Sequence, residues 1–407
     1  MKMVGRRRVL LVSPVPELDP PCGDVTYTQN LLSHAPANVE YETYAEALAA
    51  GKISELGRRS EYRAASGLRR LQSLCRIGRE RGINELRERG VLFREPFRYF
   101  SVRPGAYDLV HCHVFSAGFP GLDAPLVMSN ASTIEELYLG ARGWSERRVA
   151  LASRADAALA SRLGVQHTSH EMPKAAAVVC FTEFLRNELL SRRSTQRERL
   201  FVAPCFVEPA RRNPASHRPH RIGFVAGDFE AKGGRTVIDA FEIVRRYIPD
   251  AELLIVGSPP RGDPSELLRR GIIWRPWVER SELLGSYLPT LDVFAYPTEC
   301  DGLPLTVLEV MAGGIPVATS DHGAMPEIVG HGQAGAVTPT GDALALGHAL
   351  LKLLAPDENV RARERTAAWF DRHYAPAVAV AQLLRAYDAA AGDRHNEDVG
   401  DRVEEAR

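Results

Sequence analysis

The chain has 407 residues, of which 45% are hydrophobic and 25% are charged, and its 51 basic and 51 acidic side chains cancel at pH 7. These values are typical of globular proteins and argue against a collagen-like, intrinsically disordered or membrane-embedded chain. A chain of this length corresponds to two or three domains and can bury enough surface to fold without disulfide or metal staples.

The charge is divided unevenly along the chain. Residues 1–220 carry 32 basic and 23 acidic side chains, whereas residues 221–407 carry 19 and 28. The basic surplus is concentrated in residues 52–103, which hold fourteen basic and six acidic side chains. A basic half joined to an acidic half predicts two domains with different tasks.

The cysteines and the hydropathy pattern indicate the cellular compartment in which the protein is expected. The six cysteines have no C-x-x-C spacing, which argues against a zinc site or a disulfide framework and fits a reducing compartment. The apolar run Val9–Val12 is too short for a signal peptide, and no stretch reaches the length of a transmembrane helix. We therefore expect a soluble, cytoplasmic protein.

Short apolar runs alternate with longer amphipathic stretches along the whole chain, which predicts βαβ units and parallel sheets. In the first half the expected strands are Val9–Ser13, Leu109–His113, Leu126–Ser129, Val178–Phe181 and Leu200–Ala203. The expected helices there are Val25–Ser33, pieces of 52–103, 145–163 and Glu183–Arg192, the last with Thr182 as N-cap.

A proline-rich segment separates the two halves. Residues 204–220 contain four prolines and little apolar periodicity, so we assign 205–220 as a linker. The strands expected after it are Ile222–Val225, Leu253–Val256, Asp292–Tyr296 and Pro316–Ala318. The helices expected after it are Gly234–Tyr247, Ser281–Tyr287, Leu305–Ala312, Asp342–Leu354, 358–373 and 376–390. The charged tail at 393–407 is expected to be disordered.

The segment 292–320 carries the clearest chemical signal, because a strand, a Pro/Gly loop and a helix follow one another. A helix N-terminus at this place is a phosphate-binding site. Asp301 and Glu309 flank the turn, and carboxylates accept hydrogen bonds from sugar or ribose hydroxyls. For Asp301 alone, stabilisation of the helix dipole is the simpler interpretation. The available backbone donors are those of Gly302, Leu303, Leu305 and Thr306, since Pro304 has no N–H.

The stretch DGLPLTVLEVMAGGIPVATS, residues 301–320, resembles the signature of glycosyltransferase family 4, whose members are retaining nucleotide-sugar enzymes with the GT-B fold. The family pattern places two glutamates with seven residues between them. Glu309 matches the second glutamate, which implies contact with the nucleotide ribose. Asp301 replaces the first glutamate, which implies contact with the donor sugar and a difference in donor placement or donor choice.

A second segment of the same half is also similar to the family. Phe224–Gly234 resembles the strand and loop in which a lysine contacts the donor diphosphate, and Lys232 matches that lysine. Asp228 stands where many members have an arginine. Because only five of the 51 basic residues are lysines, a lysine in this glycine-rich loop carries some information of its own. The simpler interpretation is a surface lysine after a turn.

In the first half, Pro20–Asp24 resembles the glycine-rich loop after the family's first strand, so Gly23 is expected near the donor phosphates or the acceptor. The run YDLVHCH, residues 107–113, resembles a strand whose last histidine lies near the acceptor and the reacting sugar, which implies that role for His113. Asn130 occupies the corresponding position at the end of the next strand. A metal site at His111 and His113 lacks an evident third ligand, and a buried, hydrogen-bonded histidine is the stronger competing interpretation.

The resemblance extends over nearly the whole chain and implies an α/β, GT-B architecture of two Rossmann-like domains that face each other across a cleft. Its parts are an acceptor-side domain at 1–204, a linker at 205–220, a donor-binding domain at 221–375 and a helix at 376–390 that packs back on the first domain. The implied activity is transfer of a sugar, with retention, from a nucleoside diphosphate-sugar to an acceptor hydroxyl, with UDP as the expected nucleotide. The catalytic residues that it implies are His113, Lys232 and Asp301.

Neither a metal nor a cofactor is expected, in keeping with the lack of a D-x-D pattern near a strand end, and no nucleic acid partner is expected. The basic stretch 52–103 suggests an anionic or lipid-linked acceptor, or peripheral contact with the inner membrane surface. Solvated Arg-rich helices and attraction between the two halves are simpler explanations. Two other functions stay open: a GT-B-fold epimerase or phosphorylase, and a degenerate, non-catalytic partner subunit, suggested by Asp24, Asp228 and Asp301.

Overall fold

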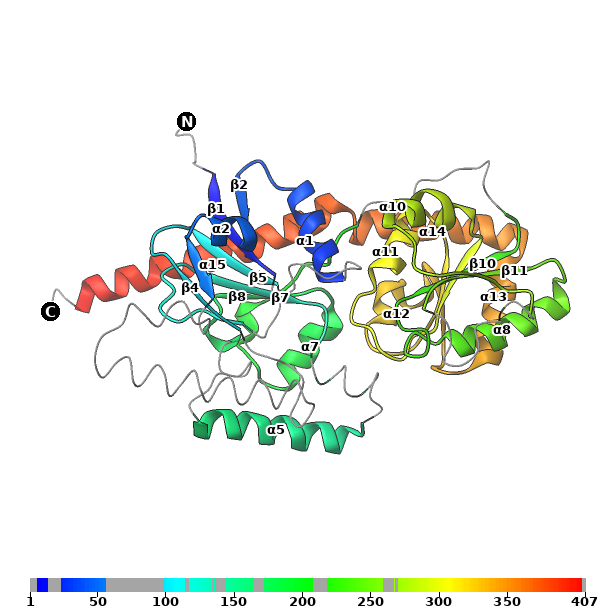
Figure 1. The fold of residues 1–407 in the computed structure, drawn as a ribbon, viewed down its shortest axis with the longest axis horizontal. Helices are drawn as coiled ribbons and strands as arrows, with labels where there is room; N and C mark the ends of the chain where they lie inside the picture. The colour runs from blue at the N-terminus through cyan, green and yellow to red at the C-terminus, as the bar shows by residue number, and fades with distance from the viewer. Residues whose placement is uncertain are drawn as a thin grey trace.

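The computed structural model describes residues 6–13, 23–55, 98–113, 117–133, 135, 139, 144–163, 172–207, 218–258, 267 and 270–404. Two lobes, each built around a parallel sheet, lie along the long axis of the molecule (Figure 1). Most of the basic stretch (56–97), the loop residues Pro20–Cys22 and the linker residues 208–217 lie outside the described residues.

The first lobe contains a six-stranded parallel sheet in the order β2-β1-β5-β7-β8-β9. Its strands are β1 (Arg7–Val12), β2 (Val39–Thr43), β5 (Leu109–His113), β7 (Leu126–Asn130), β8 (Ala177–Cys180) and β9 (Leu200–Val202). The strand order reverses between β1 and β5, and ligands of such sheets bind in the crevice beyond the carboxyl ends of those two strands. A small second sheet comprises β3 (Ile53–Glu55), β4 (Arg98–Val102) and β6 (Ala117–Gly118).

The second lobe repeats the design with the strand order β12-β11-β10-β13-β14-β15. Its strands are β10 (Arg221–Ala226), β11 (Glu252–Gly257), β12 (Ile273–Arg275), β13 (Val293–Tyr296), β14 (Val317–Ser320) and β15 (Gly335–Thr338). This is the order of a dinucleotide-binding fold, and its switch point lies between β10 and β13.

Both lobes also contain helices. Those of the first lobe are α1 (Gly23–Ser33), α2 (Tyr44–Ala49), α5 (Glu146–Leu163) and α7 (Glu183–Ser191). Those of the second are α8 (Gly234–Tyr247), α10 (Arg280–Glu282) with a π-turn at Leu283–Tyr287, α11 (Leu305–Ala312), α12 (Met325–Ile328), α13 (Ala343–Leu354) and α14 (Pro356–His373). Short 3₁₀ turns occur at Met172–Lys174, Arg197–Arg199, Leu288–Thr290 and Gly330–Gly332.

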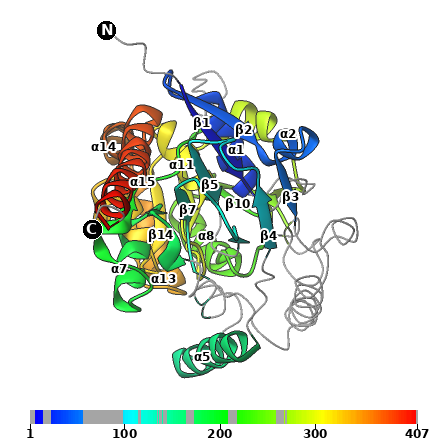
Figure 2. The ribbon, with the colours of Figure 1, turned by 90° about the vertical axis from the view of Figure 1, so that its left-hand side faces the viewer.

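The last helix, α15 (Pro376–Glu404), connects the lobes. It follows α14 of the second lobe and runs along the first lobe, where it contacts β7, β8 and β9 (Figures 1 and 2). Leu383, Tyr387 and Ala390 of this helix are buried in the core that they share with the sheet. The helix extends to Glu404, where the sequence pattern predicts a disordered tail from residue 393.

The expected α/β class with parallel sheets is confirmed. All nine predicted strands are present, with ends shifted by at most two residues. The sequence pattern missed β2, β12 and β15, which are edge strands of the two large sheets and are only partly buried. It also missed the small sheet: β3 and β4 are strands at the two described ends of the stretch 52–103, where helices were expected. Central strands buried on both faces produce continuous apolar runs, whereas edge strands have mixed composition and give a weaker signal. No helix in the described part of the chain is long and apolar enough to span a bilayer.

Candidate active site

Two loops meet at the switch point of the second sheet. The loop after β10 carries Lys232, and the loop after β13 carries Asp301. Gly233 has a positive φ of 79°, and a Cβ there would collide with the carbonyl oxygen of Pro297, so the two loops touch through a glycine. Asp228 tightens the first loop, because its carboxylate accepts a hydrogen bond from the Ala231 N–H at 3.1 Å. The sheet therefore places Lys232 beside the second loop.

Lys232 and Asp301 form an ion pair, with 2.7 Å between Nζ and Oδ2. The Tyr296 hydroxyl donates to the same carboxylate oxygen at 2.8 Å. Tyr296 is buried, and its ring stacks on the ring of Phe294, which lies two residues earlier on the same strand. The sequence pattern identified Tyr296 only as the last residue of a strand. Nothing in an apolar run indicates that the hydroxyl of its final residue contacts the loop that follows. Tyr296 and Lys232 together hold Asp301 by one oxygen.

Helix α11 begins beside this pair. Its N-cap is Pro304, which has no polar side chain, so the first backbone N–H groups of the helix receive no side-chain cap from that residue. Glu309 lies on the second turn, is 1% exposed and forms an ion pair with Arg280 of α10. Burial raises the pKa of Glu309, and the Arg280 guanidinium opposes that rise. Arg280 was missed at the sequence level, because it lies 29 positions away in an unremarkable helical segment.

A histidine that the sequence did not single out also lies here. His322 follows β14, and its Nε2 is buried without a hydrogen-bond partner among the described residues. Burial lowers the pKa of His322, and the charged groups that act on it include Glu299, Lys232 and Asp301. His322 therefore presents an unused ring nitrogen near the pair formed by Lys232 and Asp301.

In the first lobe, His113 ends β5 and is buried, with its Nδ1 2.9 Å from the Ser129 hydroxyl. His111 lies on the same face of the strand, and Cys112 packs into the core on the other face. The prediction that the two histidines share a face is confirmed. No cluster of three metal-ligating side chains occurs in the part of the chain that the structure describes. Gly23 is the first residue of α1.

The two lobes meet close to the predicted site residues. A Cβ added at Gly302 would collide with the backbone oxygen of Ala131, so the loop before α11 packs against the loop after β7. Asn130 shapes that second loop, because its side-chain oxygen accepts the Ala131 N–H at 2.7 Å. The loops that carry Asn130 and Gly302 therefore lie against each other. Asn130 is the residue predicted on the acceptor side, and Gly302 is the one predicted on the donor side.

We expect Gly302→Ala to reduce turnover strongly, by about tenfold or more, because the new methyl group forces the two loops apart and misplaces reactants held across them. The measurement is steady-state turnover together with thermal unfolding. Gly285→Ala is the matched control, because a Cβ at Gly285 meets nothing within 4 Å. Equal turnover of the two variants would contradict a functional contact at Gly302.

A second contact between the lobes involves Glu327 of α12. Its carboxylate accepts the Glu183 N–H at 2.8 Å and the Phe184 N–H at 2.9 Å, at the start of α7. Thr182 caps the next N–H of that helix, that of Leu185. Burial raises the pKa of Glu327. A residue of one lobe therefore completes the N-terminal cap of a helix in the other.

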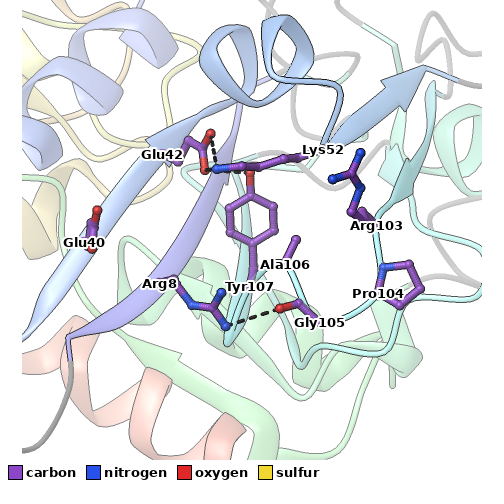
Figure 3. A pocket seen from close by; sticks show the side chains of 9 residues that line it. All are labelled: Arg8, Glu40, Glu42, Lys52, Arg103, Pro104, Gly105, Ala106 and Tyr107. Atoms are coloured by element: carbon purple, nitrogen blue, oxygen red, sulfur yellow. Dashed lines mark hydrogen bonds and ion pairs between the residues drawn. The ribbon is translucent and has the colours of Figure 1, made fainter.

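A pocket of about 300 Å³ lies elsewhere, beside β1 and β2 (Figure 3). Two of its charged side chains pair with each other: Lys52 contacts Glu42 at 2.8 Å, and the Tyr107 hydroxyl donates to the same carboxylate at 2.9 Å. Arg8 near the start of β1 and Tyr107 before β5 place the pocket toward the amino ends of these strands. The predicted residues lie at the carboxyl ends, where ligands of such sheets bind.

Two lobes, each with a six-stranded parallel sheet of Rossmann-like strand order, are the architecture of the GT-B class of glycosyltransferase fold. The family model described as "Glycosyl transferases group 1" matches residues 219–356. The chain therefore carries a domain of the glycosyl transferases group 1 family, and this domain contains Lys232, Asp301 and Glu309.

Curated relatives agree with this assignment. The amylovoran biosynthesis glycosyltransferase AmsK of Erwinia amylovora is 30% identical over 201 residues, which are 44% of this chain and 49% of AmsK. The phosphatidyl-myo-inositol mannosyltransferase of Mycobacterium leprae is 30% identical over 173 residues, 40% of this chain and 45% of that protein. The chain spans just under half the length of these curated relatives.

Solved structures share the fold over nearly the whole chain. Anabaena HepE in complex with UDP has a TM-score of 0.60 at 14% identity and covers 94% of this chain and 100% of its own. Sucrose-phosphate synthase from Thermosynechococcus elongatus has a TM-score of 0.59 at 16% identity and covers 95% and 100%. At these identities the comparison establishes the GT-B fold.

Proposed function

We propose that the protein is a retaining hexosyltransferase that moves a sugar from a nucleoside diphosphate-sugar to an acceptor hydroxyl. The observation that carries the proposal is the meeting of Lys232, Asp301 and the start of α11 at the switch point of the second sheet. A cation and a helix N-terminus suit a diphosphate, and a carboxylate held by one oxygen suits a sugar hydroxyl.

The relatives support the donor class. The matched curated proteins are a biosynthetic glycosyltransferase and a mannosyltransferase, and HepE has been solved with UDP-glucose. We infer a UDP-sugar donor that lies on the second lobe, with the ribose at Glu309 and the diphosphate at Lys232 and the N–H groups of residues 302–306. Ribose hydroxyls would replace or share the contact that Arg280 makes with Glu309.

In the proposed reaction the bond between the anomeric carbon and the diphosphate breaks, the acceptor oxygen bonds to that carbon on the same face, and the proton of the acceptor hydroxyl passes to the leaving diphosphate. The leaving diphosphate gains negative charge, and the Lys232 ammonium and the N–H groups at the start of α11 are placed to stabilise it. Lys232 is already oriented by Asp301, so it needs little reorganisation when this charge develops. We propose that no metal takes part.

The acceptor is proposed to enter from the first lobe, near His113 and Asn130. Its hydroxyl would reach the donor where the loop after β7 meets Gly302. Because the stretch 52–103 is basic, we also propose that the acceptor is anionic or lipid-linked, or that the protein contacts the inner membrane face peripherally. A cytoplasmic location follows from the use of a nucleotide-sugar.

The direct test is a screen for release of UDP or GDP from a panel of nucleotide-sugars, with and without candidate acceptors. Acceptor-dependent release together with a glycosylated product supports the proposal. Conversion of the donor sugar without an acceptor would indicate an epimerase instead. Failure to bind any nucleoside diphosphate by calorimetry would indicate a non-catalytic partner subunit.

We expect Asp301→Glu to keep turnover within about tenfold of the wild type and to change the ratio of kcat/KM values among donor sugars. The extra methylene moves the carboxylate relative to Tyr296 and Lys232, and a shift of one methylene in a binding pocket changes discrimination by about 1–3 kcal/mol. The measurement is kcat/KM for several UDP-sugars. Asp301→Asn is the matched comparison, because it keeps the length and removes the charge. An unchanged donor ratio in Asp301→Glu would contradict a role for Asp301 in sugar recognition.

A further inference from the structure

The N-terminal cap of helix α7 is built by both lobes. The helix opens with the backbone N–H groups of Glu183, Phe184 and Leu185, which have no carbonyl partner inside the helix. The N–H of Leu185 donates to the Thr182 hydroxyl at 3.2 Å, within the first lobe. The other two donate to the carboxylate of Glu327, at 2.8 Å and 2.9 Å. Two of the three capping bonds therefore come from the second lobe.

This contact requires a carboxylate. The N–H of Glu183 donates to Oε1 of Glu327 and the N–H of Phe184 donates to Oε2, so each carboxylate oxygen has its own donor. A glutamine of the same shape offers one oxygen and one NH₂ group, and the NH₂ group cannot accept a hydrogen bond. The negative charge also lies at the positive end of the α7 dipole. The contact therefore depends on both the charge and the length of the Glu327 side chain.

The second-lobe end of the contact is firmly held. Glu327 lies on α12 between Met325 and Ile328, which are both fully buried. The indole Nε1 of Trp369, on α14, donates to the carbonyl oxygen of Ile328 at 3.0 Å. Burial raises the pKa of Tyr374, which follows α14, and the nearby Glu327 carboxylate adds to the rise. Glu327 is therefore fixed near the place where α14 ends and the chain returns to the first lobe.

The first-lobe end of the contact adjoins the predicted acceptor side. Helix α7 follows β8 directly, with Phe181 and Thr182 between them. The ring of Phe181 stacks on that of His113, with 5.5 Å between the centroids and 15° between the planes. The backbone N–H of Phe181 donates to the carbonyl oxygen of Asn130 at 3.2 Å. The segment that Glu327 holds therefore contacts both residues that are predicted on the acceptor side.

The connections between the lobes explain why such a contact matters. The chain passes from the first lobe to the second after β9 and returns between α14 and α15. Two connections leave free the rotation about the line that joins them, so contacts between the lobes set the angle. Helices α7 and α12 lie on the facing sides of the two lobes, where a bond between them opposes this rotation (Figure 1).

We propose that Glu327 is a positioning residue that fixes the angle between the lobes, so that an acceptor bound to the first lobe is aligned with a donor bound to the second. Glu327 acts through α7 and the segment before it. Reactants that are held on separate bodies react only when those bodies are correctly oriented, and a small misplacement lowers the rate strongly. The fixed angle follows from contacts within the protein, and only its effect on turnover rests on the proposed function.

The first experiment measures the distance between the lobes without substrate. Spin labels at Leu48→Cys and Tyr247→Cys, which are exposed positions of the first and second lobe, report this distance by pulsed electron resonance. Cys22 and Cys75 are replaced by serine, because the other four cysteines are buried. We expect Glu327→Ala to broaden the distance distribution or to shift its maximum.

Thr182→Ala is the matched control, because it removes a capping bond from the same helix without breaking a bond between the lobes. It should keep the wild-type distance distribution. A wild-type distribution in folded Glu327→Ala overturns the proposal. An equal change in Thr182→Ala also overturns it, because the loss of helix capping would then be the cause.

Glu327→Gln gives a second route if Glu327→Ala folds poorly. It keeps the size of the side chain but provides one acceptor for two N–H donors, so we expect the distance distribution to change in this variant as well. A wild-type distribution in Glu327→Gln would show that the paired carboxylate bonds do not set the angle, which contradicts the proposal.

The second experiment connects the angle to the reaction. With a donor and an acceptor in hand, Glu327→Ala should lower kcat by about tenfold or more. The dissociation constant of UDP, measured by calorimetry, should stay unchanged, because the proposed donor site lies on the second lobe alone. Wild-type kcat in a variant whose distance distribution has changed would overturn the role in alignment. The expected distance changes in a protein that transfers no sugar support positioning by Glu327 and count against the proposed function alone.

Discussion

Glu309→Gln is expected to lower kcat/KM by about 100-fold or more, which corresponds to about 2.7 kcal/mol of transition-state stabilisation. Glu309 is 1% exposed, and its carboxylate is the predicted acceptor for the ribose hydroxyls. Hydrogen bonds from hydroxyls to a charged group contribute about 1.5–3 kcal/mol each, and an amide oxygen provides only a weaker, neutral acceptor. Glu309→Ala should be at least as severe. The measurement is steady-state kinetics together with calorimetry of UDP binding.

The same substitution should not destabilise the fold. Because burial raises the pKa of Glu309 in the folded state, its ionised form opposes folding at pH values above the unfolded pKa, and Gln removes that cost. The Arg280 side chain is 33% exposed as a whole but its Nη2, which faces Glu309, is buried, and the amide oxygen of the substituted side chain can still accept a hydrogen bond from it. We therefore expect an equal or higher free energy of unfolding at neutral pH, measured by urea denaturation.

Glu358→Gln is the matched control for charge removal. Glu358 also pairs with arginines, Arg361 at 3.2 Å and Arg365 at 2.6 Å, but it lies on α14 away from the candidate site. Its turnover should equal that of the wild type. Wild-type turnover in Glu309→Gln, or the same loss of turnover in both variants, would contradict the proposed role of Glu309 in binding the donor ribose.

Lys232→Met is the second variant for which we expect a large effect, a fall in kcat of about 100- to 1,000-fold. Methionine keeps the apolar stem and removes the ammonium that is placed to stabilise the leaving diphosphate, and loss of one such group has effects of this size. The loss should appear mainly in kcat, because the charge develops in the transition state. Single-turnover kinetics would separate it from effects on donor binding, and Lys232→Ala should behave alike.

Lys52→Met is the matched control for this variant. Lys52 also forms an ion pair with a carboxylate, 2.8 Å from Glu42, but it lines the pocket near the amino ends of the first sheet. If the general loss of an ion pair were the cause, both variants would lose stability and activity together. We expect Lys52→Met to keep full turnover, and a near-wild-type rate in Lys232→Met would refute the proposed role of the ammonium.

The sequence was enough to select the candidate site residues but not to predict their contacts. The spacing between Asp301 and Glu309 and the lysine in a glycine-rich loop were visible because they lie within short segments joined to recognisable strands. The carboxyl ends of β10 and β13 then had to lie together once the sheet formed. Asn130 was expected to face an acceptor, yet its side-chain oxygen is engaged by the backbone of its own loop, a local turn that residue type alone does not distinguish from binding.

By itself, the sequence determined that the chain forms two parallel sheets, because strands buried on both faces require continuous apolar runs that few other structures tolerate. It also located the segments that carry chemical groups. Only the tertiary structure decided the partners: Arg280 for Glu309, Tyr296 for Asp301, and Tyr387 for His111. These contacts join segments through packing between helices, loops and sheets. No local periodicity records which distant side chain completes a buried polar group, so the partners appear only when the fold closes.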